Sequence, residues 1–269
     1  MQVVFAIPLK CPQNEEERLR IDLLLELTLE SVARQTSRDY MAVVCGHVRP
    51  ERALARHPNV IWLEVTYTPP TSSQEFRADK HRKRLVIARH VQHLAPLYYM
   101  ALDADDLIHR KCVEHVLTKS NNAGFYVNEG YALDFRSGFI APIPGVWNSP
   151  FHKICGSSGI VYLEPQDFPQ GDGENDTSLF TKTQSHTRLL DNTTKSNRIL
   201  APLPFRGAVY VVNNGINISY EIIGEKRMHV VQRITELRIP ASTPALHRYT
   251  NPELFNEIRK NPVFRNLGT

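Results

Sequence analysis

Short apolar runs alternate with longer amphipathic segments along the first hundred residues. The run "QVVFAIPL" (2–9) is apolar and is closed by prolines, a pattern typical of a buried strand. The segment 14–35 that follows predicts a helix with one buried face. Its helically spaced apolar positions are Leu19, Leu23, Leu24 and Leu27.

Two further apolar runs and a second amphipathic segment complete this half of the chain. The runs "YMAVVCG" (40–46) and "NVIWLEVTY" (59–67) are rich in β-branched and aromatic residues and predict buried strands. The basic segment 76–94 then leads directly into the apolar run "LYYMAL" (97–102). The order of these elements predicts an α/β fold with a largely parallel sheet, whose ligands bind beyond the carboxyl ends of the strands. The apolar face of the basic helix is expected to consist of Leu85, Ala88, Val91 and Leu94.

The second half of the chain has a weaker pattern. We expect a helix at "CVEHVLTK" (112–119) and two strand-like pieces within "GFYVNEGYALDF" (124–135). The run "GAVYVVNNGINISY" (207–220) predicts a strand that enters a turn at its two asparagines and glycine. No repeat or low-complexity linker divides the chain, so we expect one domain.

Composition and charge narrow the class of protein only slightly. Of the 269 residues, 42% are hydrophobic and 22% are charged, which is ordinary for a soluble globular protein. A net charge of +4 falls short of the clustered basic surface of a nucleic-acid-binding protein, so we expect no nucleic-acid partner.

The cysteines and the N-terminus indicate the compartment. The four cysteines are spread along the chain without the spacing of a zinc site or a disulfide framework, which predicts reduced, partly buried thiols. The N-terminus lacks the basic region of a signal peptide, and no apolar run reaches the length of a membrane span. We therefore expect a cytoplasmic protein and leave peripheral contact with a membrane open.

The apolar run 97–102 ends in "DADD", a group of three carboxylates. If the strand continues, Asp103 and Asp105 point to one side and Ala104 points to the other. Such carboxylates repel each other unless a divalent cation lies between them, and Mg²⁺ binds proteins through one or two carboxylates plus phosphates. Asp106 is expected to cap the helix that follows. An isolated D-x-D pattern is more often a plain turn, but the strand before it and the helix after it favour a binding site.

Four segments together resemble the nucleotide-binding half of the GT-A glycosyltransferases, especially those of family 2. They are "VVFAIPL", "LESVARQT" before "YMAVVCG", "DKHRKRLVIARHV" and "YYMALDADDLI". The resemblance covers about the first 115 residues. It implies a three-layer α/β/α sandwich around a mixed, mostly parallel central sheet.

The resemblance also implies how a sugar nucleotide binds. Asp103 and Asp105 are expected to hold Mn²⁺ or Mg²⁺ against the diphosphate of a UDP-sugar or GDP-sugar. Asp103 and Ala104 contact this donor, and Pro8 and Leu9 lie along its nucleoside. By the same resemblance, His186 is expected as a further metal ligand.

The basic segment supplies further candidate contacts. Lys80, Lys83 and Arg84 precede the strand that carries the aspartates, and we expect them to contact the diphosphate or the sugar. For each of them, a solvated helix face is the plain alternative. Gly156, in "CGSSGIVY", is expected either to let the backbone approach the donor sugar or the acceptor, or to form a tight turn into a strand.

Transfer of a sugar to a hydroxyl requires a general base, which should be a carboxylate or a histidine opposite the leaving group. The polar segment 164–178 offers Asp176, Glu174 and Asp172. The family carries an adjacent acidic pair ahead of a helix, and Asp176 matches it best, although Asn175 separates Asp176 from Glu174.

The function implied by the resemblance is transfer of a sugar, with inversion, from a nucleoside-diphosphate sugar to a glycan or other hydroxyl acceptor, in polysaccharide or glycan synthesis. Within the single domain, residues 1–115 would bind the donor and residues 116–240 the acceptor. Residues 241–269 are expected to form a helical tail.

Two alternatives remain. One is a non-catalytic protein that binds sugars or nucleotides with the same fold. The other is a different phosphate enzyme, such as a sugar-nucleotide pyrophosphorylase or a phosphatase. The segment "PLKCPQNEEE" lacks the glycine-rich basic loop of a pyrophosphorylase, and Leu107 after "DADD" does not match the phosphatase pattern.

Overall fold

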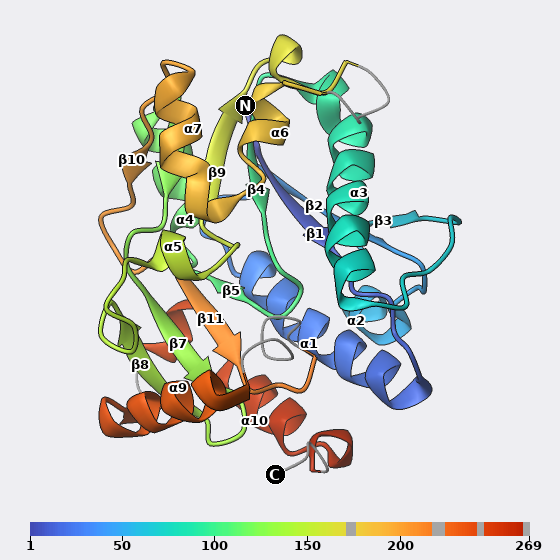
Figure 1. The fold of residues 1–269 in the computed structure, drawn as a ribbon, viewed down its shortest axis with the longest axis vertical. Coiled ribbons are helices and arrows are strands. Elements are labelled where there is room, and N and C mark those ends of the chain that lie inside the picture. Colours follow the sequence, from blue (N-terminus) through green and yellow to red (C-terminus); the bar gives the residue numbers. More distant parts are fainter. Residues whose placement is uncertain (171–175, 217–223, 241–244, 266–269) are drawn as a thin grey trace.

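A seven-stranded sheet forms the centre of the molecule (Figure 1). The computed structural model describes the chain apart from residues 171–175, 217–223, 241–244 and 266–269. The strand order is β10-β6-β9-β4-β1-β2-β3; four neighbouring pairs are parallel, and β9 is antiparallel to β4 and β6. The expected α/β class with a mixed, mostly parallel sheet is confirmed. The strands are β1 (Val3–Pro8), β2 (Tyr40–Gly46), β3 (Ile61–Glu64), β4 (Leu97–Ala101), β6 (Gly124–Tyr126), β9 (Gly159–Leu163) and β10 (Ala201–Pro202).

Helices cover both faces of this sheet. Alternate side chains of β1 point to opposite faces, and every residue of β1 is buried. Phe5 and Ile7 join the apolar cluster of α1 (Glu15–Ala33) and α4 (Cys112–Lys119). Val4 and Ala6 join the cluster of α3 (Ser73–Val91), α6 (Leu179–Lys182) and α7 (Leu189–Lys195). Burial on both faces explains why the strand reads as a continuous apolar run.

Helix α1 follows the pattern expected from its leucines. The side chain of Asn14 accepts a hydrogen bond of 2.8 Å from the backbone N–H of Glu17, which satisfies a donor at the helix start. Leu19 is 38% exposed because it lies on the side of the helix away from the sheet. The other expected core positions, Leu23, Leu24 and Leu27, are buried.

Helix α3 buries charge as well as apolar surface. It begins with a capping box, in which the Ser72 hydroxyl and the Glu75 carboxylate each accept a backbone hydrogen bond of the other residue. Ala88 and Val91 are fully buried, as expected from the pattern. The same helix also buries three charged side chains at the carboxyl ends of the strands, namely Asp79, Lys83 and Arg84.

A second sheet, with the order β12-β8-β7-β11-β5, was not expected from the sequence. Residues of β7 and β11 belong to the same apolar cluster as α1, so the two sheets share a core. In this sheet β7 and β11 are parallel neighbours although some 70 residues separate them along the chain. Its strands are β5 (Leu107–Ile108), β7 (Gly130–Asp134), β8 (Phe139–Ile143), β11 (Ala208–Val212) and β12 (Ile239–Pro240).

The remaining helices are short, apart from α9 (Gly224–Glu236). Helix α9 packs on β7 and β8, and α10 (Pro252–Arg259) packs on α1. Beyond the end of α10, the carbonyl of Val263 accepts a 2.9 Å hydrogen bond from Arg20 Nε of α1. In the part of the chain that the structure describes, the other α-helices are α2 (Glu51–Arg56) and α5 (Phe151–Ile154), and the 3₁₀ turns are η1 (Gln92–Leu94), η2 (Pro165–Asp167), η3 (His186–Arg188), η4 (Leu246–Arg248) and η5 (Pro262–Phe264).

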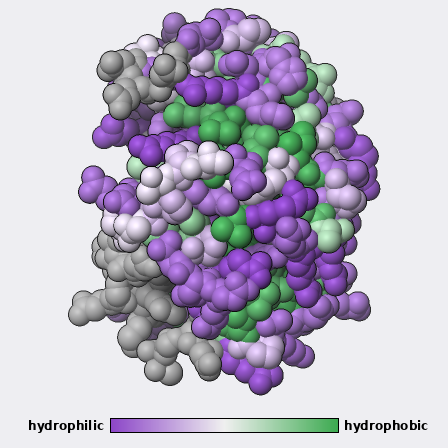
Figure 2. Space-filling model, turned by 90° about the vertical axis from the view of Figure 1, so that its right-hand side faces the viewer, coloured by the Kyte–Doolittle hydropathy of each residue, from purple (hydrophilic) through white to green (hydrophobic). Residues whose placement is uncertain are grey.

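The two segments expected to bind donor and acceptor, 1–115 and 116–240, contribute strands to the same sheet. Strands β6, β9 and β10, from the segment 116–240, extend the sheet that begins within residues 1–115. All four cysteines are buried and free. The face that carries α3 and β3 is mainly hydrophilic, with hydrophobic residues in separate groups (Figure 2). No helix within the described ranges combines the length and the apolar character needed to cross a membrane.

Candidate functional site

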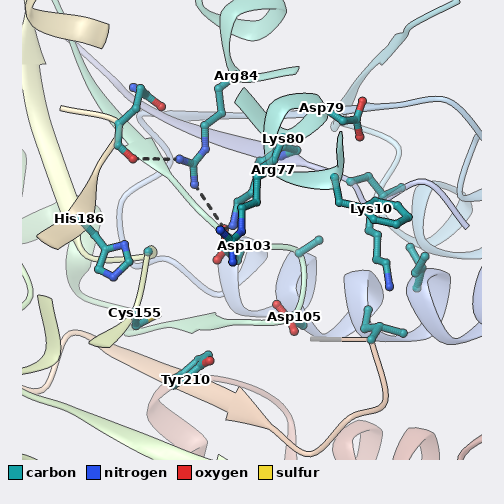
Figure 3. Close-up of a pocket in the computed structure, with 18 of the residues that line it drawn as sticks. Lys10, Arg77, Asp79, Lys80, Arg84, Asp103, Asp105, Cys155, His186 and Tyr210 are labelled. Atoms are coloured by element: carbon teal, nitrogen blue, oxygen red, sulfur yellow. Dashed lines mark hydrogen bonds and ion pairs between the residues drawn. The ribbon is translucent and has the colours of Figure 1, made fainter. Parts of the chain in front are cut away.

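A cavity of about 410 Å³ lies at the carboxyl ends of β1 and β4. Strands β1 and β4 are parallel neighbours, but the chain adds β2 and β3 on one side of β1 and then adds β4 on the other side. Where the strand order changes direction in this way, a crevice forms between the two strand ends, and α/β proteins bind ligands there. Residues expected to contact a donor or metal that line this cavity are Pro8, Leu9, Lys80, Arg84, Asp103, Ala104, Asp105 and His186 (Figure 3).

Asp103 and Asp105 both line the cavity, but not for the reason expected. Strand β4 ends at Ala101, so the two aspartates do not alternate along a strand. They belong to a turn in which the backbone N–H of Asp106 donates a 3.1 Å hydrogen bond to the carbonyl of Asp103. The turn brings both carboxylates to the same cavity.

Asp103 is paired with cations of α3. Its Oδ1 lies 2.7 Å from the Lys80 ammonium and 3.5 Å from the Arg84 guanidinium (Figure 3). Burial raises the pKa of Asp103, but the charges of Lys80 and Arg84 outweigh it and hold the pKa below its usual range. Asp103 is therefore ionised at neutral pH. A side chain at Gly156 would place its Cβ 3.2 Å from Asp103 Oδ2, so glycine permits this close approach.

Asp105 has a different environment. Burial, followed by the negative charge of Asp103, raises its pKa to about 6. Asn214 Nδ2 donates a 2.8 Å hydrogen bond to Asp105 Oδ2 and opposes that rise. The Asn214 amide is oriented by the backbone N–H of Ile216, which donates to its oxygen at 3.0 Å. Asp105 is thus held in place by the segment after β11.

Asp106 does not cap the following helix, and that prediction was wrong. Helix α4 begins only at Cys112, and Asp106 is fully buried behind the turn. It accepts hydrogen bonds from Ser157 Oγ at 2.6 Å, from Cys155 Sγ at 3.0 Å and from the backbone N–H of Val211 at 3.1 Å. Burial, together with the charges of the two preceding aspartates, raises its pKa well above the usual range.

The hydrogen bonds of Asp106 fix the turn that carries the other two aspartates. Ser157 donates to Asp106 and accepts a 2.9 Å hydrogen bond from the backbone N–H of Asp103. The turn is therefore tied to the segment before β9 and to β11. These contacts come from residues far away in the sequence, which is why capping was the simpler expectation.

Lys83 does not line the cavity, although we expected it to contact the donor. It is fully buried, and its ammonium donates to Asp79 Oδ2 at 2.6 Å and to the Leu9 carbonyl at 2.7 Å. Asp79 also accepts a 2.9 Å hydrogen bond from the Tyr67 hydroxyl. Lys83 therefore holds the loop after β1, so that Leu9 faces the cavity.

His186, on η3, lies at the side of the cavity near Asp103 (Figure 3). Burial lowers the pKa of its imidazole, with an opposing contribution from Asp103. Within the described residues, no three His, Cys, Asp or Glu side chains are arranged to hold a metal ion. Asp103 and Asp105 remain the acidic pair that a cation in this cavity would contact.

Of the three residues expected to act as general base, only Asp176 belongs to the described part of the chain, and it does not line the cavity. Asp176 binds locally at the start of α6, where it accepts hydrogen bonds from Ser178 Oγ at 2.7 Å and from Thr181 Oγ1 at 2.5 Å. Burial raises the pKa of Asp176, but these hydrogen bonds outweigh it and lower the pKa. Asp176 is not among the residues that line the cavity. Glu174 and Asp172 lie outside the described residues.

Sequence reasoning missed several residues that line the cavity. Arg77 precedes Lys80 by three residues, so the helical spacing of α3 would have placed it on the same face. Lys10 follows Leu9 and lies over the Phe76 ring, with its ammonium 5.2 Å from the ring centre. Tyr210 comes from β11 and carried no signal in the sequence.

Comparison of the sequence with models of known protein families and with curated proteins gave no match. The chemistry of the site is therefore inferred from the residues that line the cavity. Two carboxylates of one turn and three cations of one helix, Arg77, Lys80 and Arg84, face the same space. Such a site offers ligands for a divalent cation and for phosphate oxygens at once.

Proposed function

We propose that this chain is a metal-dependent glycosyltransferase of the GT-A type, which transfers a sugar from a nucleoside-diphosphate sugar to an acceptor hydroxyl. The observation that carries the proposal is that Asp103 and Asp105 share one cavity with the cations of α3, at the crevice between β1 and β4. The mixed sheet with helices on both faces also agrees with the fold that the resemblance implies.

The carboxylates of Asp103 and Asp105 fit a divalent cation. Mg²⁺ and Mn²⁺ favour carboxylate oxygens, and Mg²⁺ commonly takes one or two protein carboxylates and completes its shell with phosphates and water. Burial, and then the charge of Asp103, raise the pKa of Asp105, and a divalent cation between the two carboxylates would oppose both effects. Asp103 and Asp105 would hold the cation, which stabilises the charge that develops on a diphosphate leaving group.

The chain's own residues supply the rest of the donor site. Arg84 is held by the Gln184 carbonyl, to which its guanidinium donates at 3.3 Å, and it would bind a phosphoryl oxygen together with Lys80. Asn214 keeps the Asp105 carboxylate turned toward the cavity. Pro8 and Leu9 offer an apolar wall to the nucleoside. The acceptor would then approach from the side opposite the diphosphate.

Acceptor activation requires a base on that side. Asp176 is engaged in hydrogen bonds with Ser178 and Thr181, which makes it a weak base, and its role stays a prediction. Inversion at the sugar carbon, a glycan acceptor in polysaccharide or glycan synthesis, and a cytoplasmic or membrane-associated location are likewise proposals that follow from the resemblance alone.

Thermal unfolding of the full chain with UDP or GDP, in the presence and absence of Mn²⁺, tests the donor site. Ligands that bind the folded chain raise its melting temperature, by an amount that depends on their concentration relative to Kd. We expect stabilisation only when nucleotide and metal are both present, and its loss in Asp105→Ala. Asp191→Ala, which removes an exposed carboxylate on α7, is the matched control.

Product analysis separates the proposed activity from its alternatives. A glycosyltransferase releases a nucleoside diphosphate from the sugar nucleotide. A binding protein shows stabilisation without turnover, and a pyrophosphorylase forms nucleoside triphosphate from the sugar nucleotide and pyrophosphate. Absence of stabilisation by every nucleotide with Mn²⁺ contradicts the proposal.

A further inference from the structure

The Lys80 ammonium lies beside Asp103, one of the two carboxylates that a cation in this cavity would contact. Its Nζ lies 2.7 Å from Asp103 Oδ1, and the Arg84 guanidinium lies 3.5 Å from the same oxygen. On the other side of this carboxylate, Oδ2 lies against Gly156. Two positive side chains therefore neutralise Asp103 before any ligand arrives.

We infer that Lys80 is an internal counter-ion of Asp103. When the donor binds, the Lys80 ammonium moves from Asp103 to the diphosphate, and this exchange makes the binding of metal and nucleotide cooperative. The inference rests on the proposed function, because it concerns the same donor site. It goes beyond that function by assigning to Lys80 the coupling between metal binding and nucleotide binding.

Charge explains why the metal alone should bind weakly. A divalent cation that approaches Asp103 meets the positive charges of Lys80 and Arg84 at the same carboxylate. It must displace the ammonium or accept repulsion at close range. A diphosphate removes this conflict, because its oxygens can accept hydrogen bonds from both side chains and also coordinate the metal.

The two side chains differ in freedom, and this difference identifies Lys80 as the one that moves. The Lys80 side chain is 35% exposed, whereas that of Arg84 is 9% exposed and is held by the Gln184 carbonyl. Lysine has a flexible stem and a point charge, so it can change partners within the cavity. Arg84 is expected to stay in place, beside Asp103 in the absence of the donor and beside both Asp103 and the diphosphate when the donor is bound.

Mn²⁺ binding to the full chain, measured from the electron paramagnetic resonance signal of free Mn²⁺, tests the inference without any assay of activity. For the unmodified chain, we expect UDP or GDP to tighten Mn²⁺ binding by about tenfold or more. In Lys80→Met, Mn²⁺ alone should bind about tenfold more tightly, and the gain from nucleotide should fall below about threefold. Lys80→Gln should behave in the same way and serves as a second variant.

Lys119→Met is the matched control, since it removes the same charge from an exposed position on α4. It should bind Mn²⁺ as the unmodified chain does, with and without nucleotide. If Lys80→Met and Lys80→Gln bind Mn²⁺ alone no more tightly than the control, the internal counter-ion is contradicted while nucleotide-dependent binding still supports the donor site. If no variant shows nucleotide-dependent Mn²⁺ binding, the proposed donor site itself is overturned.

Discussion

Two ion-pair clusters on α3 begin one residue apart and have opposite surroundings. In the closed cluster, Asp79 and Lys83 are buried, and Lys83 donates to Asp79 and to the Leu9 carbonyl. Asp79 also lines the cavity, but Lys83 does not. The open cluster, Lys80 and Arg84 with Asp103, faces the cavity. In both clusters the two residues of α3 lie four positions apart, but the closed cluster has its carboxylate on the helix, whereas Asp103 lies outside it. The partly exposed Lys80 of the open cluster can exchange partners with a ligand, whereas the fully buried Lys83 of the closed cluster holds the loop after β1 in place.

The largest effect should come from the carboxylates beside the open cluster. Asp105→Asn keeps the shape of the side chain but removes its charge, so the metal and the leaving group lose electrostatic stabilisation. We expect the rate of nucleoside diphosphate release to fall by roughly 10²- to 10³-fold. The melting temperature should change little, because the amide can still pack beside Asn214. A rate within about threefold of the unmodified chain would exclude Asp105 from catalysis.

The next largest effect should separate the two lysines of α3 by stability. Lys83→Met leaves the buried Asp79 carboxylate without its cation and should cost about 3–5 kcal/mol of unfolding free energy. Lys80→Met removes a partly exposed ion pair and should cost about 0–1 kcal/mol. Urea unfolding of both variants measures the difference. Equal costs would show that the distinction between a closed and an open cluster has no energetic basis.

The order of the first elements was predictable because each depends on local pattern. Strands β1, β2, β3 and β4 and helix α1 lie within the expected segments, and α3 begins three residues before its expected segment. Burial makes β1, β2 and β4 continuously apolar, whereas the expected burial of β3 was wrong, because its residues are partly or fully exposed. The second sheet was not predictable in this way. Strands β5 and β12 are only two residues long, and β11 pairs with β7 from a distant part of the chain.

The residues of the candidate site also divide into those that could be placed from the sequence and those whose position depends on distant contacts. Lys80 and Asp103 could be placed at the cavity from the order of strands and helices, and Pro8 from the resemblance to the family. Asn214, the partner of Asp105, could not, because its position depends on β11 and the second sheet. Asp106 was misread for a similar reason: its hydrogen-bond donors on residues 155–157 and 211 are remote in sequence, so nothing local indicated its burial.

A smaller, pH-dependent effect concerns His109, which lies outside both clusters. Burial, with the nearby charges of Arg248, Arg110 and Lys111, lowers its pKa to about 4, and its Nδ1 accepts a 3.2 Å hydrogen bond from the Lys111 N–H. An unfolded histidine has a pKa of about 6.5, so the unfolded chain binds the proton more readily. The stabilisation from neutral His109 is thus fully present above about pH 6.5 and is lost as the pH falls toward 4.

Urea unfolding at pH 7 and pH 5 measures this contribution. We expect the unmodified chain to lose about 1–2 kcal/mol more than His109→Gln over that interval. Other histidines also titrate there, and the variant subtracts their shared effect. Identical pH dependence in both proteins would contradict the assignment.

The smallest effect should come from Asp176. Asp176→Ala removes hydrogen bonds to Ser178 and Thr181 and should cost about 1 kcal/mol of stability. Because Asp176 does not line the cavity, nucleoside diphosphate release should change by less than about fivefold. A fall of about 10²-fold or more would instead restore Asp176 as the general base.

Anomalous X-ray scattering from Mn²⁺ in crystals of the chain grown with a nucleoside diphosphate tests the central claim most directly. The account predicts a single strong peak in the cavity, within coordination distance of carboxylate oxygens of Asp103 and Asp105, with Lys80 turned to the diphosphate. A peak elsewhere, or a bound nucleotide with Lys80 still on Asp103 and no metal between the aspartates, would contradict it.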